Sequence, residues 1–433
     1  MKKASLVCLA WVTIFLGSFA LADEEYKFDI SEIEKKPYNI GGYLEVKPIV
    51  FVLDRDAALY KLKFYDHDVG KTTQEYDGKL LLDGSLEKGI ARLFVRANAD
   101  LKYSYLGWDN DTSLYEGYLS LKPSSSLTFK LGKQTLPWGK GYAWNPVAFV
   151  SRPKDSDDPE LALEGYITAS ADYIKSFDGP LKTISMTPVL VPVYENINDD
   201  FGEINHLNFA GKLYFLLYDT DIDLIGLVGE SKTNRVGFDF SKNVTTNFEI
   251  HGEYAFINNQ KIKVINSQGK ISKETFDANS FLLGTRYLTT SDTTFIFEYY
   301  RNGTGFTQSQ MEGYFSFIDR GYDLFLSTGN DSLLNKASSV TAGNYGKSNP
   351  MQDYLYLRIT QKEPFDILYF TPAITGIMNL NDGSMSISPE LLYSGIKNLE
   401  LRLKGSALIG QNGSEYGEKA NDYRIELRVR YYF

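Results

Sequence analysis

Histidine is the side chain best suited to acid–base chemistry near neutral pH, and this chain has three: His67, His206 and His251. Only His251 alternates with carboxylates, since Glu249 and Glu253 lie two residues to either side. Residues two apart share one face of an extended strand, so we expect these three groups together on a polar face. The sequence contains no Gly-x-Ser-x-Gly nucleophile motif. We therefore expect no catalytic residue and no enzyme.

Two further segments have only a superficial likeness to ligand-binding motifs. Residues 132–140 resemble a phosphate-binding loop, but six residues instead of four separate the glycines, and Gly141 stands where a hydroxyl should hold magnesium. Residues 155–160 are acidic but lack the glycine and the distant glutamate of an EF-hand. The alternative there is an adventitious Ca²⁺ site. We expect no cofactor and no metal centre.

The C-terminal segment, residues 423–433, shows how the remaining charged residues must be positioned. Its charged side chains occupy every second position, namely Arg424, Glu426, Arg428 and Arg430. The apolar positions between them are Tyr423, Ile425, Leu427, Val429, Tyr431 and Phe433. Strand side chains alternate with period two, so one face is apolar and the other charged. This pattern is typical of a membrane β-barrel strand, with lipid outside and water in the lumen.

Other alternating segments, assigned in the same way, predict which charges point into the lumen. The basic ones are Arg92, Arg96, Lys130, Arg286, Arg358, Arg402, Lys404, Arg424, Arg428 and Arg430. The acidic ones are Glu116, Glu249, Glu253, Glu298, Glu400 and Glu426. Basic rings favour anions, so this wall predicts an anion preference. The alternative is that these charges only pair across strands and keep the lumen wet.

The connections between the alternating segments are short and long in turn. Short ones include 122–126 and 362–364, and the long ones include 136–165, 258–278 and 302–350. Outer-membrane barrels have short periplasmic turns and long extracellular loops. We therefore predict an all-β fold, an antiparallel up-and-down transmembrane barrel of about 18 strands, with 16 as the second choice. The alternative of a secreted β-sandwich or solenoid does not account for this asymmetry.

The N-terminal residues predict export. Lys2 and Lys3 precede an uncharged run that ends in a small-x-small site at 20–22, as in a cleaved signal peptide. We expect a signal peptide at 1–22, a periplasmic lead-in at 23–39 and the barrel at 40–433. The single cysteine, Cys8, would leave with the signal, which excludes disulfides and thiolate ligands.

The composition agrees with export to the outer membrane. The formal net charge of −10 disfavours a nucleic-acid partner, and no later segment is apolar enough for a spanning helix. An exported, tyrosine-rich chain of this kind is expected in the outer membrane of a Gram-negative cell, in contact with its lipid.

The most distinctive sequence lies in the long connection 136–165. It follows Lys133-Gln134 and contains Trp138-Gly139, Asn145-Pro146 and Arg152-Pro153-Lys154-Asp155-Ser156-Asp157-Asp158-Pro159-Glu160. Here the chain resembles porin-like outer-membrane families of poorly defined function, in which an arginine is more usual at the place of Lys133. The resemblance implies a loop that dips into the pore and narrows it. The candidate constriction residues are Trp138, Lys140, Trp144, Arg152 and Asp155. The alternative is a surface loop whose aromatic residues mark the membrane interface.

The longest connection, 302–350, contains helical spacing at Leu333, Leu334 and Ala337. A helix there either folds into the lumen as a plug or caps the outside of the barrel.

These features together predict a porin-like channel for passive diffusion of small hydrophilic solutes, with an anion preference. Two alternatives stay open. The barrel could surround a partner such as a secreted multihaem cytochrome in an electron conduit, or it could be a substrate-specific channel for organic solutes. Association of three barrels and binding of a periplasmic or extracellular protein are further expectations for such a chain.

Overall fold

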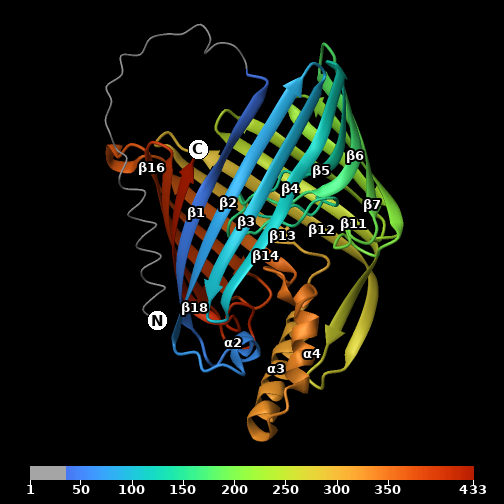
Figure 1. Cartoon of the computed structure of the whole chain (residues 1–433). Coiled ribbons are helices and arrows are strands. Elements are labelled where there is room, and N and C mark those ends of the chain that lie inside the picture. Colours follow the sequence, from blue (N-terminus) through green and yellow to red (C-terminus); the bar gives the residue numbers. More distant parts are fainter. Residues whose placement is uncertain (1–35) are drawn as a thin grey trace. The chain divides into compact units, whose positions relative to one another are not determined.

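A computed structural model describes residues 36–433. The expected signal peptide at 1–22 and most of the expected lead-in lie outside the described residues. The described chain forms one antiparallel barrel of eighteen strands, in which each strand pairs with its neighbours in sequence (Figure 1). The barrel closes where β1 (Tyr38–Leu53) pairs with β18 (Asn421–Tyr432). The predicted fold class and the preferred strand number are thereby confirmed.

The other strands follow one another around the barrel in chain order. They are β2 (Thr72–Lys88), β3 (Ala91–Ser104), β4 (Gly107–Ser124), β5 (Leu127–Gln134), β6 (Tyr166–Ser176), β7 (Leu181–Val193), β8 (His206–Leu217), β9 (Thr220–Val228), β10 (Arg235–Thr245), β11 (Phe248–Ile265), β12 (Ile271–Leu288), β13 (Thr293–Arg301), β14 (Asp353–Gln361), β15 (Phe370–Asn379), β16 (Met385–Ile396) and β17 (Leu399–Ile409).

The alternating pattern decides which face of each strand meets lipid. On β18, Tyr423 and Ile425 are exposed on the outside, whereas Glu426 and Arg428 are only 5 % exposed. Many such apolar side chains cover the outside of the barrel. Their combined exposed apolar area is far larger than that of a soluble monomer, and it is the expected lipid contact of a membrane barrel. The polar side chains therefore line the lumen.

Short turns gather at one end of the barrel and long connections at the other. At the short-turn end, the amide of Gly42 donates to the carbonyl of Phe433, so the start of β1 lies beside the end of the chain. The prediction of a long loop at 258–278 is wrong, because β11 and β12 continue through it as an extended hairpin. Only 266–270 turns there, since the alternation of lysine with isoleucine and valine at 261–265 is still that of a strand.

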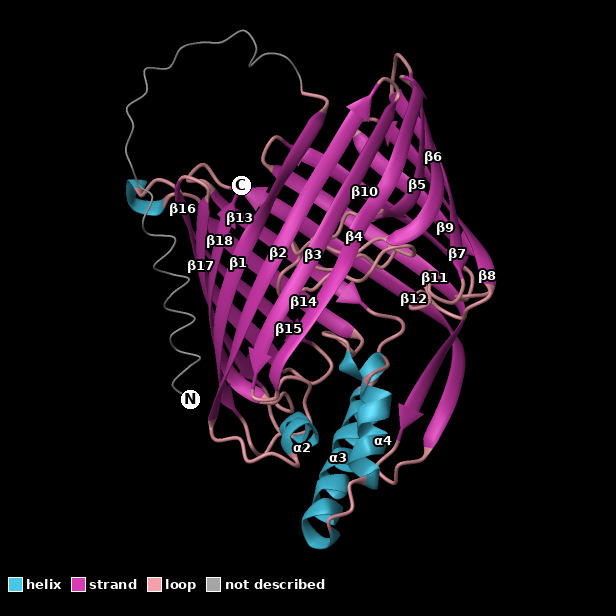
Figure 2. Ribbon diagram, viewed as in Figure 1, coloured by secondary structure: helices cyan, strands magenta, loops and turns pink. Residues whose placement is uncertain are grey.

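The longer helices lie at the long-connection end, beyond the strand ends (Figure 2). They are α2 (Ala58–Phe64), α3 (Gln308–Thr328) and α4 (Ser332–Thr341), and the one-turn helix η2 (Asn344–Gly346) follows α4 in the longest connection. A second one-turn helix, η3 (Pro364–Asp366), lies in the short turn between β14 and β15, at the other end of the barrel. The α3 helix begins with a capping box between Thr307 and Gln310 and ends at left-handed Gly329.

The α3 and α4 helices cap the outside and do not plug the lumen. Buried Phe317 and Ile318 of α3 belong to the same apolar cluster as Ile265 at the outer end of β11. Asp319 of α3 pairs with Lys61 of α2 at 2.7 Å. Within residues 36–433, no helix combines the length and the apolar character needed to cross a membrane.

Candidate functional site

The connection between β5 and β6, residues 135–165, folds into the lumen, and we call it the lumen loop. Its backbone is fixed by Glu253 of β11, whose Oε1 accepts hydrogen bonds from the amides of Lys140 and Gly141, both at 2.6 Å. The side-chain amide of Asn145 donates to the same oxygen at 2.8 Å. Gly139 is needed for this approach: its φ is +98°, and a Cβ there would lie 2.7 Å from Glu253 Oε1.

A second wall carboxylate holds the next turn of the loop. Glu298 of β13 accepts from the amides of Tyr142 and Ala143, the latter at 2.9 Å. His251 Nε2 lies 2.9 Å from Glu298 Oε1. Glu298 is 0 % exposed, so these donors compensate for the loss of its hydration.

An aromatic contact fixes the tip of the loop against the same wall. The ring of Trp144 stacks on Tyr300 with 5.1 Å between centroids, and the rings of Tyr354 and Tyr356 lie about 6 Å away. The indole N–H of Trp144 donates to Asn349 Oδ1 at 3.0 Å. The apolar area of Trp144 is therefore buried on the β13–β14 wall while its polar atom keeps a partner.

The far end of the loop reaches the opposite wall. Asp157 pairs with Lys404 of β17, at 2.9 Å, and with Arg424 of β18. Asp158 pairs with Arg428 at 2.6 Å and lies 3.6 Å from Arg402. Burial raises the pKa of Asp157, but its two cationic partners outweigh this and lower it to about 2. Asp157 and Asp158 therefore attach the loop to β17 and β18 as carboxylates.

A third contact joins the loop to β9 and β10. Lys140 Nζ lies 3.1 Å from Asp223 and 3.9 Å from Asp239. Burial lowers the pKa of Lys140, but the two carboxylates more than offset this, so the pKa is raised. The loop thus crosses the lumen between three parts of the wall.

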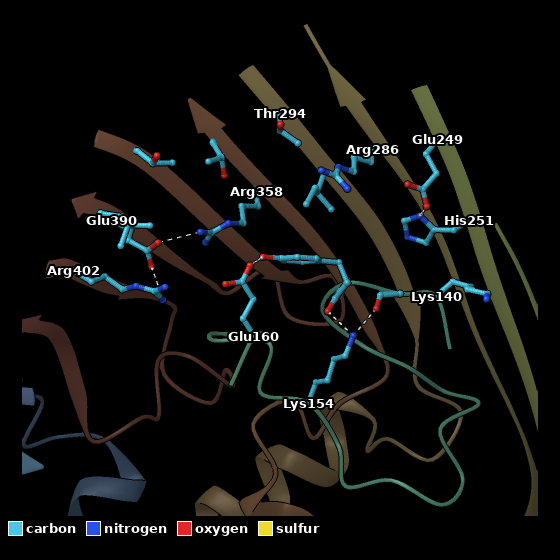
Figure 3. Close-up of a pocket in the computed structure, with 16 residues that line it drawn as sticks. Lys140, Lys154, Glu160, Glu249, His251, Arg286, Thr294, Arg358, Glu390 and Arg402 are labelled. Atoms are coloured by element: carbon cyan, nitrogen blue, oxygen red, sulfur yellow. Dashed lines mark hydrogen bonds and ion pairs between the residues drawn. The ribbon is translucent and has the colours of Figure 1, made fainter. Parts of the chain in front are cut away.

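The loop separates two chambers in the lumen. The inner chamber, toward the short turns, has a volume of about 480 Å³ and is lined by His251, Arg286, Arg358 and Glu390, among others (Figure 3). The outer chamber, toward the long connections, has about 810 Å³.

Lys154 of the lumen loop lines both chambers. Its ammonium group donates to the carbonyls of Gly141 and Tyr142 at 2.8 and 3.2 Å, as Figure 3 shows. Burial lowers the pKa of Lys154, and Glu253 and Glu298 offset only part of this. Lys154 therefore lies at the boundary between the two chambers.

The predicted basic residues fall into separate groups. Arg402, Lys404, Arg424 and Arg428 converge on the loop aspartates, as described above. Arg430 pairs with Glu45 at 2.7 Å, and Arg358 with Glu390 at 3.0 Å. Arg286 lines the inner chamber and forms no ion pair within residues 36–433.

Three predicted basic residues on β3 and β5 lie apart from this group. Arg96 lines the outer chamber and pairs with Asp83 at 2.7 Å. Arg92 lies 3.4 Å from Glu87. The ammonium of Lys130 lies 5.7 Å from the ring of Tyr118. None of the three pairs with a residue of the lumen loop, but Arg96 also lies 3.1 Å from Glu116, which binds the start of the loop.

The predicted acidic residues also serve different contacts. Glu116 accepts from the amide of Thr135 at 3.0 Å, where the loop begins. Glu249 accepts from Ser241. Glu400 lies 3.1 Å from the hydroxyl of Tyr432, and Glu426 lies between Arg424 and Arg428.

The candidate constriction residues are all in the lumen loop, but they do not form one ring. Trp138 is buried in a second apolar cluster with Val147 and Phe149. Arg152 lies 3.2 Å from Glu164 and also pairs with Asp200. The carboxylate of Asp155 accepts from the amide of Asp157 at 3.0 Å.

Sequence reasoning missed two of the carboxylates that hold the loop, Asp223 and Asp239. Alternation along β9 and β10 offered a signal for both, because Asp223 shares a strand face with Asp221, and Asp239 shares one with Ser241. The roles of Asp157 and Asp158 had no such local signal, because their partners are far away in the sequence.

Comparison with known proteins finds no matching family model and no similar curated protein. Among solved structures, OccAB1 of Acinetobacter baumannii aligns over 92% of this chain and 97% of its own, with a TM-score of 0.53 and 9% identity. OprD of Pseudomonas aeruginosa aligns over the same shares, with a TM-score of 0.50 and 13% identity. Wzi of Escherichia coli is an outer membrane protein of capsule assembly described as a carbohydrate-binding β-barrel. It aligns over 99% of this chain and 88% of its own, with a TM-score of 0.52 and 10% identity. The chain therefore has the fold of porin-like Gram-negative outer-membrane barrels, as the sequence predicts.

Proposed function

We propose that the protein is a porin-like outer-membrane channel through which small hydrophilic solutes diffuse passively. The observation that carries this proposal is the lumen loop, which crosses the barrel and leaves a chamber with charged lining residues on each side. The short-turn end would face the periplasm and the long connections the outside. Selection then depends on the width of the passage and on the charges beside it.

The charge around the inner chamber supports an anion preference. Its basic lining residues are Lys140, Lys154, Arg286, Arg358 and Arg402. Its carboxylates are Glu160, Glu249 and Glu390. Five cations against three carboxylates leave an excess of two positive charges among the Lys, Arg and Glu side chains of the lining. The excess is modest, because Lys140 also pairs with Asp223 and Arg402 also lies near Asp158, two carboxylates outside this lining.

The position of the lumen loop disfavours a sheath around a cytochrome. Asp157 and Asp158 attach it to β17 and β18, while Glu253 and Glu298 hold it on the other side. A partner that filled the barrel would have to displace these contacts. The proposal of a channel requires no such displacement.

The test is conductance of the purified barrel in planar bilayers under a salt gradient. We expect a steady ion current with a reversal potential of anion-selective sign. Lys154→Gln should move this potential toward the cation side, because it removes a positive charge from the boundary between the chambers. Lys122→Gln, at an exposed position near the short-turn end of β4, is the matched control and should leave it unchanged.

Absence of any current would contradict the channel. A cation-selective potential for the unmodified protein would refute the anion preference alone.

A further inference from the structure

The outer chamber combines an apolar floor with a cationic side. The floor belongs mainly to the lumen loop, with Leu136, Trp138 and Phe149, and to the neighbouring rings of Tyr166 and Phe201. A concave surface that combines apolar side chains with a few convergent charged groups is typical of sites for small organic ligands. The volume of about 810 Å³ is also in the range of such sites.

The cationic side is formed by Lys232, Arg235 and Lys347, which we call the outer cation cluster. Lys232 lies between β9 and β10, Arg235 begins β10, and Lys347 follows η2 in the longest connection. Within residues 36–433 none of the three forms an ion pair with a carboxylate. The nearby Asp200 is already paired with Arg152.

Aromatic rings partly stabilise this cluster. The ammonium of Lys232 lies 3.6 Å from the ring centroid of Phe201 and 5.9 Å from that of Tyr166. Arg152 lies 4.9 Å from the ring of Tyr166. Cation–π contacts offset part of the lost hydration but do not neutralise the charge. Lys347 remains exposed and can reach a solute in the chamber.

The electrostatic cost of gathering these basic side chains is visible at Lys232. Burial lowers the pKa of its ammonium group to about 7, and Arg235, Lys347 and Arg152 contribute in the same direction while Asp200 opposes them. Three basic side chains gathered without a carboxylate partner within residues 36–433 favour binding of an anion, which would pair with them and raise the pKa of Lys232 again.

We propose that the outer chamber binds a small organic anion before it passes the lumen loop. The head group, a carboxylate or a phosphate ester, contacts the outer cation cluster. The apolar or aromatic body lies on the floor formed by Trp138, Phe149 and Phe201. This inference extends the proposed channel function by naming a solute class, but the binding itself requires no conduction.

The test is isothermal titration calorimetry of the full barrel in detergent, with benzoate and phenyl phosphate as probes of the two head groups. We expect benzoate, phenyl phosphate or both to bind. Benzyl alcohol, which has the body without the charge, and inorganic phosphate, which has the charge without the body, should bind at least about tenfold more weakly.

The matched variants remove charge from the cluster and from elsewhere on the outer side. The double variant Lys232→Gln/Arg235→Gln should weaken binding by at least about tenfold, because it removes two charged partners of the head group. Lys270→Gln, in the exposed tip of the β11–β12 hairpin, removes charge outside the chamber and should bind as the unmodified protein does. Lys347→Gln alone changes an exposed residue, so it provides a second test should the double variant not fold.

Three results would overturn the inference. They are failure of both organic anions to bind, equal binding by benzyl alcohol or inorganic phosphate, and unchanged affinity in cluster variants that fold. Bilayer conductance of the same preparations separates this outcome from failure of the channel proposal. A barrel that conducts without binding refutes only the site, and one that binds without conducting refutes only the channel.

Discussion

Single side chains of the lumen loop have functions that their sequence neighbours do not reveal. Lys154 donates to two carbonyls of its own loop and borders both chambers. Asp157 neutralises cations that the strand pattern assigns to an open pore wall. The predicted cationic wall is therefore only partly available to solutes, and its excess charge is concentrated at residues such as Arg286 and Lys154.

The ion pairs of Asp157 predict how the loop responds to acid. The ordinary pKa of an aspartate is 3.8, and that of Asp157 is lowered to about 2. A lowered pKa means that the ion pairs contribute fully above the ordinary value and are lost as the pH falls through the lower one. We expect open-channel current noise to stay constant from about pH 7 to 4 and to rise between about pH 4 and 2.

The control for this prediction is Asp157→Asn, which should be noisy at every pH because it cannot form the ion pairs. A rise in noise already near neutral pH in the unmodified protein would contradict the assignment to Asp157.

At the scale of elements, the lumen loop and the strands that hold it form one structural unit. The loop follows β5, which is shorter than the adjacent strands β4 and β6. Backbone amides of the loop donate to carboxylates of β11 and β13. Alternation predicted that Glu253 and Glu298 face the lumen. It did not indicate that they bind the loop, because the donors are main-chain groups, which carry no sequence signal.

Loss of one of these carboxylates should release the middle of the loop. Glu298→Ala leaves the amides of Tyr142 and Ala143 without acceptors, at a cost of about 1–3 kcal/mol for each buried donor. Hydrogen exchange measured by mass spectrometry should then become faster at residues 140–143. Glu249→Ala, which removes a lumen carboxylate that does not contact the loop, should leave this exchange unchanged; equal acceleration in both variants would argue against a specific anchor.

At the scale of the whole molecule, barrel closure and the outer cap are largely independent. The strands pair around the full circle without the helices, which contact the outer part of the β11–β12 hairpin. The lipid-facing surface is supplied by every strand, so it does not depend on any single long connection.

Replacement of residues 308–341 by a short Gly-Ser linker tests this division. We expect a folded barrel with an unchanged heat-modifiable shift in gel electrophoresis, because strand pairing is intact. The hairpin tip at 266–270 should become sensitive to protease, because Ile265 loses its cover by Phe317 and Ile318. Failure of the barrel to form, or full resistance of the tip, would contradict the proposed independence.

The sequence by itself determined the class of fold, the eighteen strands and the face of β18 that meets lipid. These features follow from a local period of two, which is readable within about ten residues of each strand. Only the tertiary structure decided where the charges of the lumen find partners. Asp157 meets Lys404 and Arg424 across sequence separations of 247 and 267 residues. Such pairs exist only once the barrel has closed around the loop, because closure brings β17 and β18 to the side of the lumen that the loop crosses.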